Sequence, residues 1–292
     1  TTIGDRAFYG CSNLTGVSIG NSVTTIGHSA FSFCDSLTSA NIPDSVTAIG
    51  YAAFSDCDSL TSINVSGNNS SFSSVDGNLY NKDKSELIQY AIGKNNSSFS
   101  LPGSVTTIGY RAFFCCRGLT SVSIGNSVTT IGDSAFYNCD SLKSVNLGNS
   151  VTAFGYMAFA FCDSLTSVNI PNSVTTIGER AFYSCRGLTS VSIGNSVTTI
   201  GERAFDFCDS LTSVNIPNSV TTICERAFAR CCSLMSVNIP DSVITIGDAA
   251  FDFCDSLTDV YYGGSKAQWD KIMINYGNDF LTNAAIHYNH KP

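Results

Sequence analysis

Apolar and polar positions follow a pattern that recurs every 23 residues along most of this chain. Read across its copies, the pattern is C-x-x-L-x-x-V-x-I-P-x-S-V-x-x-I-G-x-x-A-F-x-x, and residues 208–230 are one copy, with Cys224 in place of the glycine. The Ile-Gly position, which is Phe154-Gly155 in one copy, keeps a step of 23 residues except between Ile49 and Ile108, where the step is 59. A period in the twenties containing L-x-x-V-x-I is typical of a solenoid.

Within one unit, the alternation over Ser213–Ile216 sends Val214 and Ile216 to one side and the polar residues to the other, which predicts a short strand. Pro217 ends this strand. The glycine after the second apolar edge is expected to allow a sharp backbone turn, and residues 202–208 are expected to form a short helical or 3₁₀ turn. One unit cannot bury its apolar side chains alone, so neighbouring units stack them into continuous ladders.

The predicted fold is therefore a leucine-rich-repeat-like solenoid. Short parallel β-strands stack into a curved sheet, with short helical or 3₁₀ turns and extended segments on the other sides. Ten units carry the strand pattern, and ten strands at about 4.8 Å each give a sheet roughly 45 to 50 Å long.

Two stretches depart from the repeat. The solenoid is expected over residues 1–260, with an irregular insertion, or a decorated unit, at about 66–101 that contains a β-hairpin turning at 81–84. Residues 261–292 are expected to form a C-terminal cap, in which Ser265 begins a short helix, Trp269 packs its apolar side and residues 284–289 form a final strand.

Thirteen cysteines suggest a disulfide scaffold, but their positions favour buried free thiols. Ten occupy one position of the repeat: Cys11, Cys34, Cys57, Cys116, Cys139, Cys162, Cys185, Cys208, Cys231 and Cys254. Stacked turns would place neighbouring thiols roughly 5 Å apart, a distance that does not by itself exclude bridging. Cys224 replaces the turn glycine and is expected to bring a local backbone adjustment or a left-handed conformation.

The composition narrows the classes of partner. The net charge is -8 and only 13% of the residues are charged, which argues against nucleic acids and anionic membranes as partners. No run of eighteen apolar residues is present to span a membrane. Because the chain starts in the middle of a repeat and shows no signal peptide, we expect it to be part of a longer protein.

The outward positions of the strands form the candidate ligand-binding face. They are small, polar and almost uncharged: Ser121, Ser123, Ser144, Asn146, Ser167, Asn169, Ser190, Ser192, Ser213, Asn215, Ser236 and Asn238. Such a concave face could hydrogen-bond glycans or a flat protein surface. It lacks the Tyr, Trp and Arg residues that dominate binding energies, so a merely solvated sheet face is the alternative.

No residue pattern demands catalysis, a metal or a cofactor. The aspartate column after the ladder cysteines offers one carboxylate a turn, too few for calcium, and Asp163, Arg186 and Asp209 are expected to form an ion ladder on the surface. The histidines, His28, His287 and His290, lack zinc or nucleophile spacing. Glycosylation sequons occur at Asn13, Asn68, Asn69, Asn95 and Asn96.

The 23-residue pattern, from its cysteine to its Ala-Phe pair, resembles that of the BspA-like (Treponema pallidum-type) leucine-rich repeat family over nearly the whole chain. Residues 69–102 resemble a variant unit of such arrays, and residues 261–289 resemble their common ending. The resemblance implies a curved solenoid on a secreted or cell-surface protein of a bacterium or a protist. Members are described as adhesins or host-matrix binders, and the family has no catalytic motif to carry over.

Two functions follow as hypotheses. The first is a non-enzymatic binding module that recognises a protein or a glycan, host-derived ligands included, through the concave face and the insertion. The second is a structural spacer or stalk in a larger surface protein. Residues 117–131 and 186–200 are identical, and such duplicated units suit multivalent contact or spacing better than a single active site.

Overall fold

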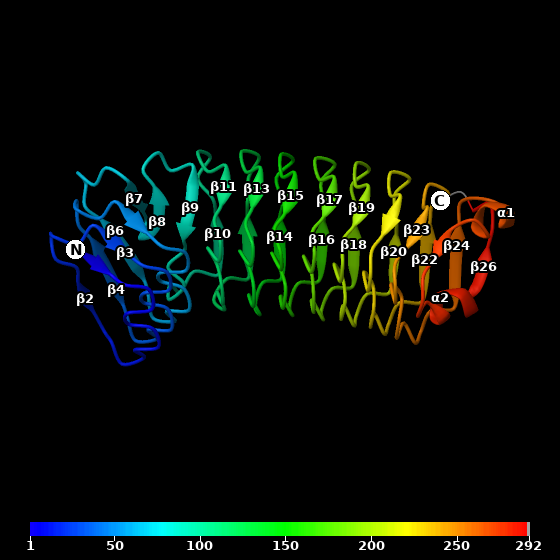
Figure 1. Cartoon of the computed structure of the whole chain (residues 1–292), viewed down its shortest axis with the longest axis horizontal. Coiled ribbons are helices and arrows are strands. Elements are labelled where there is room, and N and C mark those ends of the chain that lie inside the picture. Colours follow the sequence, from blue (N-terminus) through cyan, green and yellow to red (C-terminus); the bar gives the residue numbers. More distant parts are fainter. Residues whose placement is uncertain (291–292) are drawn as a thin grey trace.

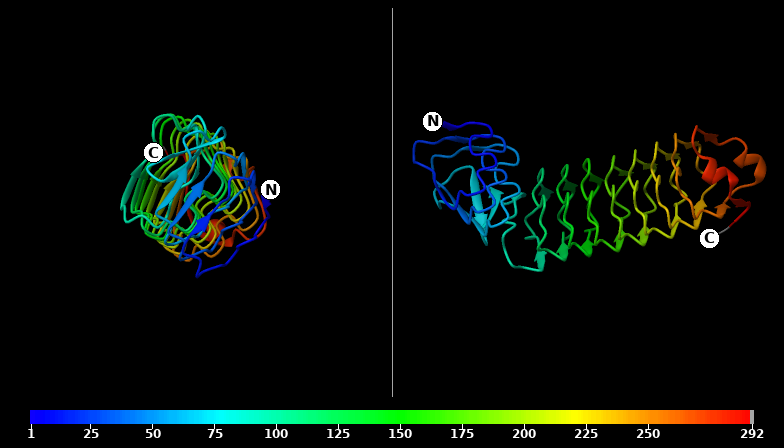
Figure 2. Two further views of the ribbon diagram at one scale, coloured as in Figure 1. Left: turned by 90° about the vertical axis from the view of Figure 1, so that its left-hand side faces the viewer. Right: turned by 90° about the horizontal axis from the view of Figure 1, so that it is seen from below.

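A computed structural model describes residues 1–290 as an elongated solenoid of stacked turns (Figures 1 and 2). Each regular turn contributes one strand to a front face and one two-residue strand to a back face. Strands of successive turns pair in parallel with a register of 23 residues, as between Val122 and Val145. The predicted leucine-rich-repeat solenoid is confirmed.

The front strands carry the alternating Ser-Val-Asn pattern, because their valines point into the core and their polar residues point out. They are β2 (Val17–Ser18), β4 (Ser39–Ile42), β6 (Ser62–Val65), β10 (Ser98–Ser100), β12 (Ser121–Ser123), β14 (Ser144–Asn146), β16 (Ser167–Asn169), β18 (Ser190–Ser192), β20 (Ser213–Asn215), β22 (Ser236–Ile239), β24 (Asp259–Tyr262) and β26 (Ala285–His287). The front strands stack in parallel along the array as predicted, but their hydrogen bonding is not continuous. The strands form four separate groups, β2–β4–β6, β10–β12–β14, β16–β18 and β20–β22–β24–β26.

The back strands are mostly Thr-Ile pairs, and most of them form one sheet of eleven strands. In chain order they are β1 (Thr2–Ile3), β3 (Thr25–Ile26), β5 (Ala48–Ile49), β7 (Phe72–Val75), β8 (Asn78–Asn81), β9 (Glu86–Gln89), β11 (Thr107–Ile108), β13 (Thr130–Ile131), β15 (Ala153–Phe154), β17 (Thr176–Ile177), β19 (Thr199–Ile200), β21 (Thr222–Ile223), β23 (Thr245–Ile246) and β25 (Met273–Ile274). Strands β1, β3 and β5 stand apart as a sheet of their own.

The segment predicted as a short helical or 3₁₀ turn is a run of tight turns in which two residues are left-handed. In one unit these are Arg203 (φ 51°) and Phe207 (φ 62°). Alternate amides bond within the turn, as Ala204 N–H does to Gly201 O at 3.2 Å, while those between them bond the next turn, as Phe205 N–H does to Ala227 O at 2.8 Å. The segment therefore adds a third hydrogen-bonded ladder between turns, which a helix would not supply.

The repeated glycine after the back strand packs closely against the preceding turn and is not left-handed. Gly201 does not have a positive φ, but a Cβ built on it would lie 2.5 Å from Ile177 O in the preceding turn. Cys224, at the same position of its unit, is not left-handed either, and its N–H bonds Ile200 O at 2.9 Å as Gly201 N–H bonds Ile177 O. Of the two alternatives expected for Cys224, the left-handed conformation is therefore wrong.

The inward side chains form two cores and not the continuous ladders expected. From Phe113 to Phe251, seven stacked phenylalanine rings lie 4.6 to 5.4 Å apart between centroids. A shorter stack of Phe8, Phe31 and Phe54 belongs to the first three turns. The two buried clusters separate near residues 79–91. Figure 1 shows the first turns tilted away from the regular array at this place.

The hairpin region causes this break. Strands β7, β8 and β9 pair antiparallel, with the hairpin turn after Asn81 as expected. β9 then pairs in parallel with β11 and returns the chain to the solenoid. Tyr90 takes over the start of the long aromatic stack, with its ring 5.1 Å from that of Phe113. Residues 86–101 thus supply one back strand, β9, and one front strand, β10, as a repeat unit does.

At the C-terminal end, two short helices follow the last regular turn: α1 (Lys266–Trp269) and α2 (Asp279–Asn283). Ser265 precedes α1, as expected, and its N–H donates to Gln268 Oε1 at 2.9 Å. Trp269 is buried edge-on against Tyr262, with 5.1 Å between the ring centroids. The final strand predicted near residue 285 is β26, which pairs with β24.

Nine of the ten ladder cysteines are buried, and all thirteen cysteines are free thiols. The exception is Cys11, which is exposed in the first turn. Most ladder thiols donate to the carbonyl of the phenylalanine 26 residues earlier, as Cys185 Sγ does to Phe159 O at 3.1 Å. A thiol thus fits this position better than a methyl group, because it packs as a small hydrophobe and also satisfies a buried acceptor.

We expect a thiol reagent at pH 8 to modify the exposed Cys11 and Cys232 in the native protein and to leave the buried ladder unmodified. Burial raises the pKa of Cys57, Cys116 and Cys254 to about 12, so the reactive thiolate is scarce there. After denaturation all thirteen thiols should react. Finding four or more disulfides in the denatured protein would contradict the free-thiol ladder.

Candidate functional site

The candidate binding face is the outward side of the front strands, here called the Ser/Asn face. Its twelve candidate residues lie on β12, β14, β16, β18, β20 and β22. Ser121, Ser123, Ser236 and Asn238 are half-buried, and the other eight are exposed: Ser144, Asn146, Ser167, Asn169, Ser190, Ser192, Ser213 and Asn215. The parallel register aligns them in two columns, so that Asn215 stands beside Asn238.

The chemistry of the Ser/Asn face is neutral hydrogen bonding. Each serine hydroxyl both donates and accepts, and each asparagine offers two donors and one acceptor oxygen. On β4 and β6 the same columns continue, and Asn64 Nδ2 donates to Asn41 Oδ1 at 3.1 Å. The face can bind a polar, flat ligand without the cost of desolvating charges.

The C-terminal end of the Ser/Asn face carries an aromatic group, because His287 and His290, which the sequence did not connect with this face, lie beside Tyr261. Tyr261 occupies the asparagine column, and the rings of His287 and His290 both lie 4.8 Å from its ring. His287 Nε2 lies 2.7 Å from Asp259 Oδ1, and this contact lowers the pKa of Asp259. In the sequence, the tyrosine at position 261 of a column that otherwise holds Ser and Asn was the signal that this end of the face differs.

A cavity of about 340 Å³ opens at this end of the face. Its polar and aromatic lining residues come from the face and its rim: Asn215, Asn218, Asn238, Asp241, Tyr261 and His290. Amides, a carboxylate and an aromatic surface around one hollow are the kind of convergent polar groups that fix the orientation of a ligand.

The other sites considered from the sequence are only partly brought together. Arg186 pairs with Asp209 at 3.9 Å, but Asp163 lies outside ion-pair distance of Arg186 within the described residues. Arg117 instead contacts Asp140 at 3.9 Å and Asp58 at 3.7 Å. In residues 1–290, no group of three potential ligands could hold a metal ion.

One sequon serves a structural purpose. Asn69 is fully buried, and its amide donates to the carbonyls of Pro43 and Val46 while its oxygen accepts from two backbone amides of its own loop. A side chain with four internal hydrogen bonds is not available for glycosylation. The Asn69 side chain therefore holds the loop before β7 in place through its hydrogen bonds.

The comparisons decide the family. The family model described as the BspA type leucine rich repeat region matches in six copies over residues 1–82, 90–208 and 175–276. This chain belongs to that family. No curated protein is significantly similar to it in sequence.

Solved structures share the fold of this BspA-type array. A leucine-rich repeat protein from Eubacterium ventriosum is 28% identical, with a TM-score of 0.75 over 88% of this chain and 81% of that one. A leucine rich cell surface protein from Faecalibacterium prausnitzii is 29% identical, with a TM-score of 0.50 over 95% of this chain and 61% of that one. A leucine-rich repeat protein from T. pallidum is 29% identical, with a TM-score of 0.55 over 61% of this chain and 86% of that one.

Away from the Ser/Asn face, a row of aromatic side chains ending at an arginine lies on the tight-turn side of this BspA-type array. An aromatic row, half-buried except for the buried Phe114, has neighbouring centroids 5.0 to 5.5 Å apart: Phe114, Tyr137, Phe161, Tyr183 and Phe207. Arg230 covers the end of the row, 4.5 Å from the Phe207 ring, and pairs with the buried Asp206 at 3.2 Å.

We expect Asp206→Asn to change the pH dependence of stability. Burial raises the pKa of Asp206 above its ordinary value of 3.8 despite Arg230. The folded state therefore binds a proton more readily than the unfolded state. The free energy of unfolding falls as the pH rises from the unfolded pKa of this carboxyl through its folded pKa. Urea titrations at pH 4 and pH 7 should show that Asp206→Asn loses part of the gain in stability on acidification.

Asp83→Asn is the matched control, because the hydrogen bonds from Ser85 lower the pKa of Asp83. The contribution of Asp83 is present above its unfolded pKa and is lost on acidification, so its removal should have the opposite sign. Equal pH profiles for the two variants would contradict the assignment.

In residues 1–290, no helix is both long and apolar enough to cross a membrane.

Proposed function

We propose that this chain is a non-enzymatic binding module of a secreted or cell-surface protein, and that it recognises a protein or a glycan through the Ser/Asn face. The observation that carries the proposal is the continuity of two neutral polar columns from β12 to β22, ending at the cavity beside Tyr261 and His290. Host-derived ligands belong to the same proposal.

The expected mode of binding is many weak contacts anchored at one end. Single hydroxyl and amide hydrogen bonds contribute about 0.5–1.5 kcal/mol each. The stacked rings of Tyr261 and His287 add an apolar surface against which a sugar ring or an aromatic side chain could pack. Repeated units presenting the same groups favour an extended ligand with its own repeat.

The proposed location outside the cell is supported by similarity to a solved structure. The F. prausnitzii structure is described as a cell surface protein, and it is similar over 95% of this chain. This chain covers 61% of that protein's length, so the wider architecture of the surface protein is also part of the proposal.

A structural spacer is the second candidate. It is favoured by the identical residues 117–131 and 186–200 and by the absence of aromatic or charged side chains at the candidate positions from Ser144 to Asn238. A spacer needs only regular stacking, which the inward ladders supply.

A binding screen with face variants separates the two functions. The intact chain is tested on a glycan array and against extracellular-matrix proteins, beside Asn215→Lys on the Ser/Asn face and Thr176→Lys on the back sheet as the control of equal charge. Binding that falls at least tenfold in Asn215→Lys alone is expected. Absence of binding at high micromolar concentration would favour the spacer.

A further inference from the structure

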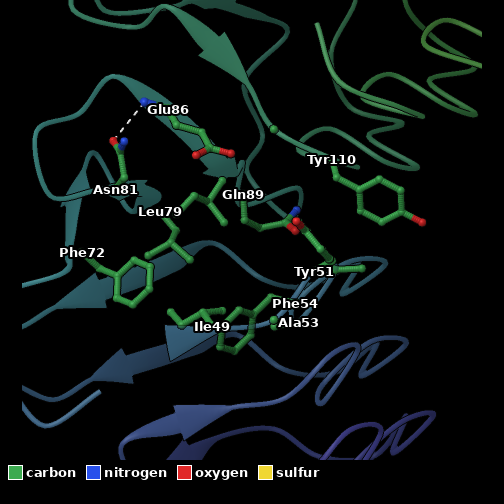
Figure 3. Close-up of a pocket in the computed structure, with 14 residues that line it drawn as sticks. Ile49, Tyr51, Ala53, Phe54, Phe72, Leu79, Asn81, Glu86, Gln89 and Tyr110 are labelled. Atoms are coloured by element: carbon green, nitrogen blue, oxygen red, sulfur yellow. Dashed lines mark hydrogen bonds between the residues drawn. The ribbon is translucent and has the colours of Figure 1, made fainter. Parts of the chain in front are cut away.

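A second cavity lies away from the Ser/Asn face, where the hairpin interrupts the back sheet. It has a volume of about 240 Å³ and lies between the third turn and strands β7, β8 and β9 (Figure 3). The buried side chains of Phe54, Phe72 and Leu79 form its apolar side. Pockets for drug-sized ligands usually hold about 300–1,000 Å³, so this one suits a smaller molecule.

Glu86 supplies the cavity with a carboxylate that has no counter-ion. It is half-buried on β9, and in residues 1–290 no Lys, Arg or His nitrogen lies within 4.0 Å of its oxygens. A Cβ on Gly109 would lie 3.0 Å from Glu86 Oε1, so the glycine leaves room for this carboxylate. Burial raises the pKa of Glu86, which indicates that a cation beside it would be favoured.

The side chain of Gln89, which also lines the cavity, is already hydrogen-bonded within the protein. Its amide donates to Tyr90 O at 3.0 Å, and its oxygen accepts from Ser55 Oγ at 3.3 Å. Among the lining residues, the Glu86 carboxylate is therefore the charged side-chain acceptor that is left for a ligand.

Residues 50–57, in the third turn of the solenoid, add backbone N–H groups that have no hydrogen-bond acceptor in the described part of the chain. In the second turn, Ser29 N–H and Phe31 N–H bond the carbonyls of the following turn at 3.0 and 2.8 Å. The hairpin displaces the turn that should follow the third one, and the equivalent N–H groups of Ala52 and Phe54 have no acceptor in residues 1–290. Both residues are buried and line the cavity. Buried amides without acceptors are costly and favour a carboxylate or another acceptor.

Two tyrosines stand at the edge of the cavity. The rings of Tyr51 and Tyr110 meet edge to face with 5.7 Å between centroids, and both side chains are partly exposed. Figure 3 shows them at one side of the cavity, next to Gln89. Aromatic faces attract ammonium groups, so they add to the preference set by Glu86.

We propose that this cavity binds a free α-amino acid with an aliphatic side chain. Glu86 holds its ammonium group, the amides of Ala52 and Phe54 receive its carboxylate, and the apolar side accommodates its side chain. The site needs both charges in one small molecule, because Glu86 and the two residues with unpaired amides, Ala52 and Phe54, line the same small cavity.

Calorimetry on the intact chain with L-leucine tests the site, with L-leucinamide and N-acetyl-L-leucine as probes that lack one charge each. L-leucine is expected to bind, and each probe at least about tenfold more weakly, a difference of about 1.4 kcal/mol. No heat with L-leucine at millimolar concentration would overturn the proposal, and so would equal binding of L-leucinamide.

Glu86→Gln keeps the shape of the side chain and should weaken L-leucine binding at least tenfold. Glu179→Gln, at an exposed glutamate outside the cavity, is the control and should bind as the wild type does. Circular dichroism verifies that both variants fold. Unchanged binding by folded Glu86→Gln would overturn the proposal, and the Ser/Asn-face screen is independent of either result.

Discussion

Phe182→Ala is expected to lower the free energy of unfolding by about 3–5 kcal/mol, the usual cost of removing a buried aromatic ring. The Phe182 ring is fully buried and stacks on Phe159 at 5.3 Å and on Phe205 at 5.4 Å. Phe154 also meets it edge-on at 5.5 Å. Removing the ring leaves a void between two turns that the backbone ladders prevent from closing. Urea denaturation followed by circular dichroism measures the loss.

Phe253→Ala removes the same atoms from an exposed site and serves as the control. Its ring is 50% exposed, beside Arg230 and Phe280, so the loss should be roughly 1 kcal/mol or less. Equal losses for the two variants would mean that the phenylalanine stack does not hold the turns together.

Gly148→Ala is expected to destabilise the protein by about 1–3 kcal/mol, because overpacking strains a closely packed core. A Cβ on Gly148 would collide with the carbonyl of Gly125 in the preceding turn. That atom belongs to the backbone and cannot move aside as a flexible side chain could. The effect should appear in the same denaturation experiment.

Gly20→Ala tests the same Gly-Asn-Ser sequence where the space is open. Nothing lies within 4 Å of a Cβ on Gly20, so its unfolding free energy should change by about 0.5 kcal/mol or less. If Gly148→Ala were equally harmless, close approach of turns could not be the reason for the glycine.

The regular turns could be predicted from the sequence because each residue type repeats in one role. Val214 and Ile216 alternate with polar residues, and a period of two fixes which side faces the core. Cys185 and Phe182 recur at a fixed spacing, and only an inward position suits both throughout an array. The same logic identified the columns of the Ser/Asn face, whose role in binding stays a proposal.

The failures have physical reasons. A repeated glycine such as Gly201 is compatible with a left-handed turn or with close packing, and only the neighbouring turn distinguishes the two. The break near Tyr90 depends on how the hairpin re-enters the stack, which local patterns do not specify. The group of Tyr261, His287 and Asp259 was missed because 28 residues separate its two acid–base members, a spacing foreign to the repeat.

Both candidate sites lie where the regular array changes. The cavity beside Tyr261 forms where the last turns acquire aromatic residues, and the cavity beside Glu86 forms where the hairpin leaves amides of the third turn unpaired. Regular stacking satisfies the polar groups between turns and fills the space around them. Interruptions therefore create the hollows and the unsatisfied groups that ligands can use.

The central structural claim is that the hairpin divides one repeat array into two cores. Hydrogen exchange of the intact chain, resolved along the sequence, tests it most directly. We predict one common free energy of opening for the amides of residues 113–251 and a separate, lower one for those of residues 26–57, since the longer ladder buries more apolar surface. A single opening free energy shared by both stretches would contradict the division.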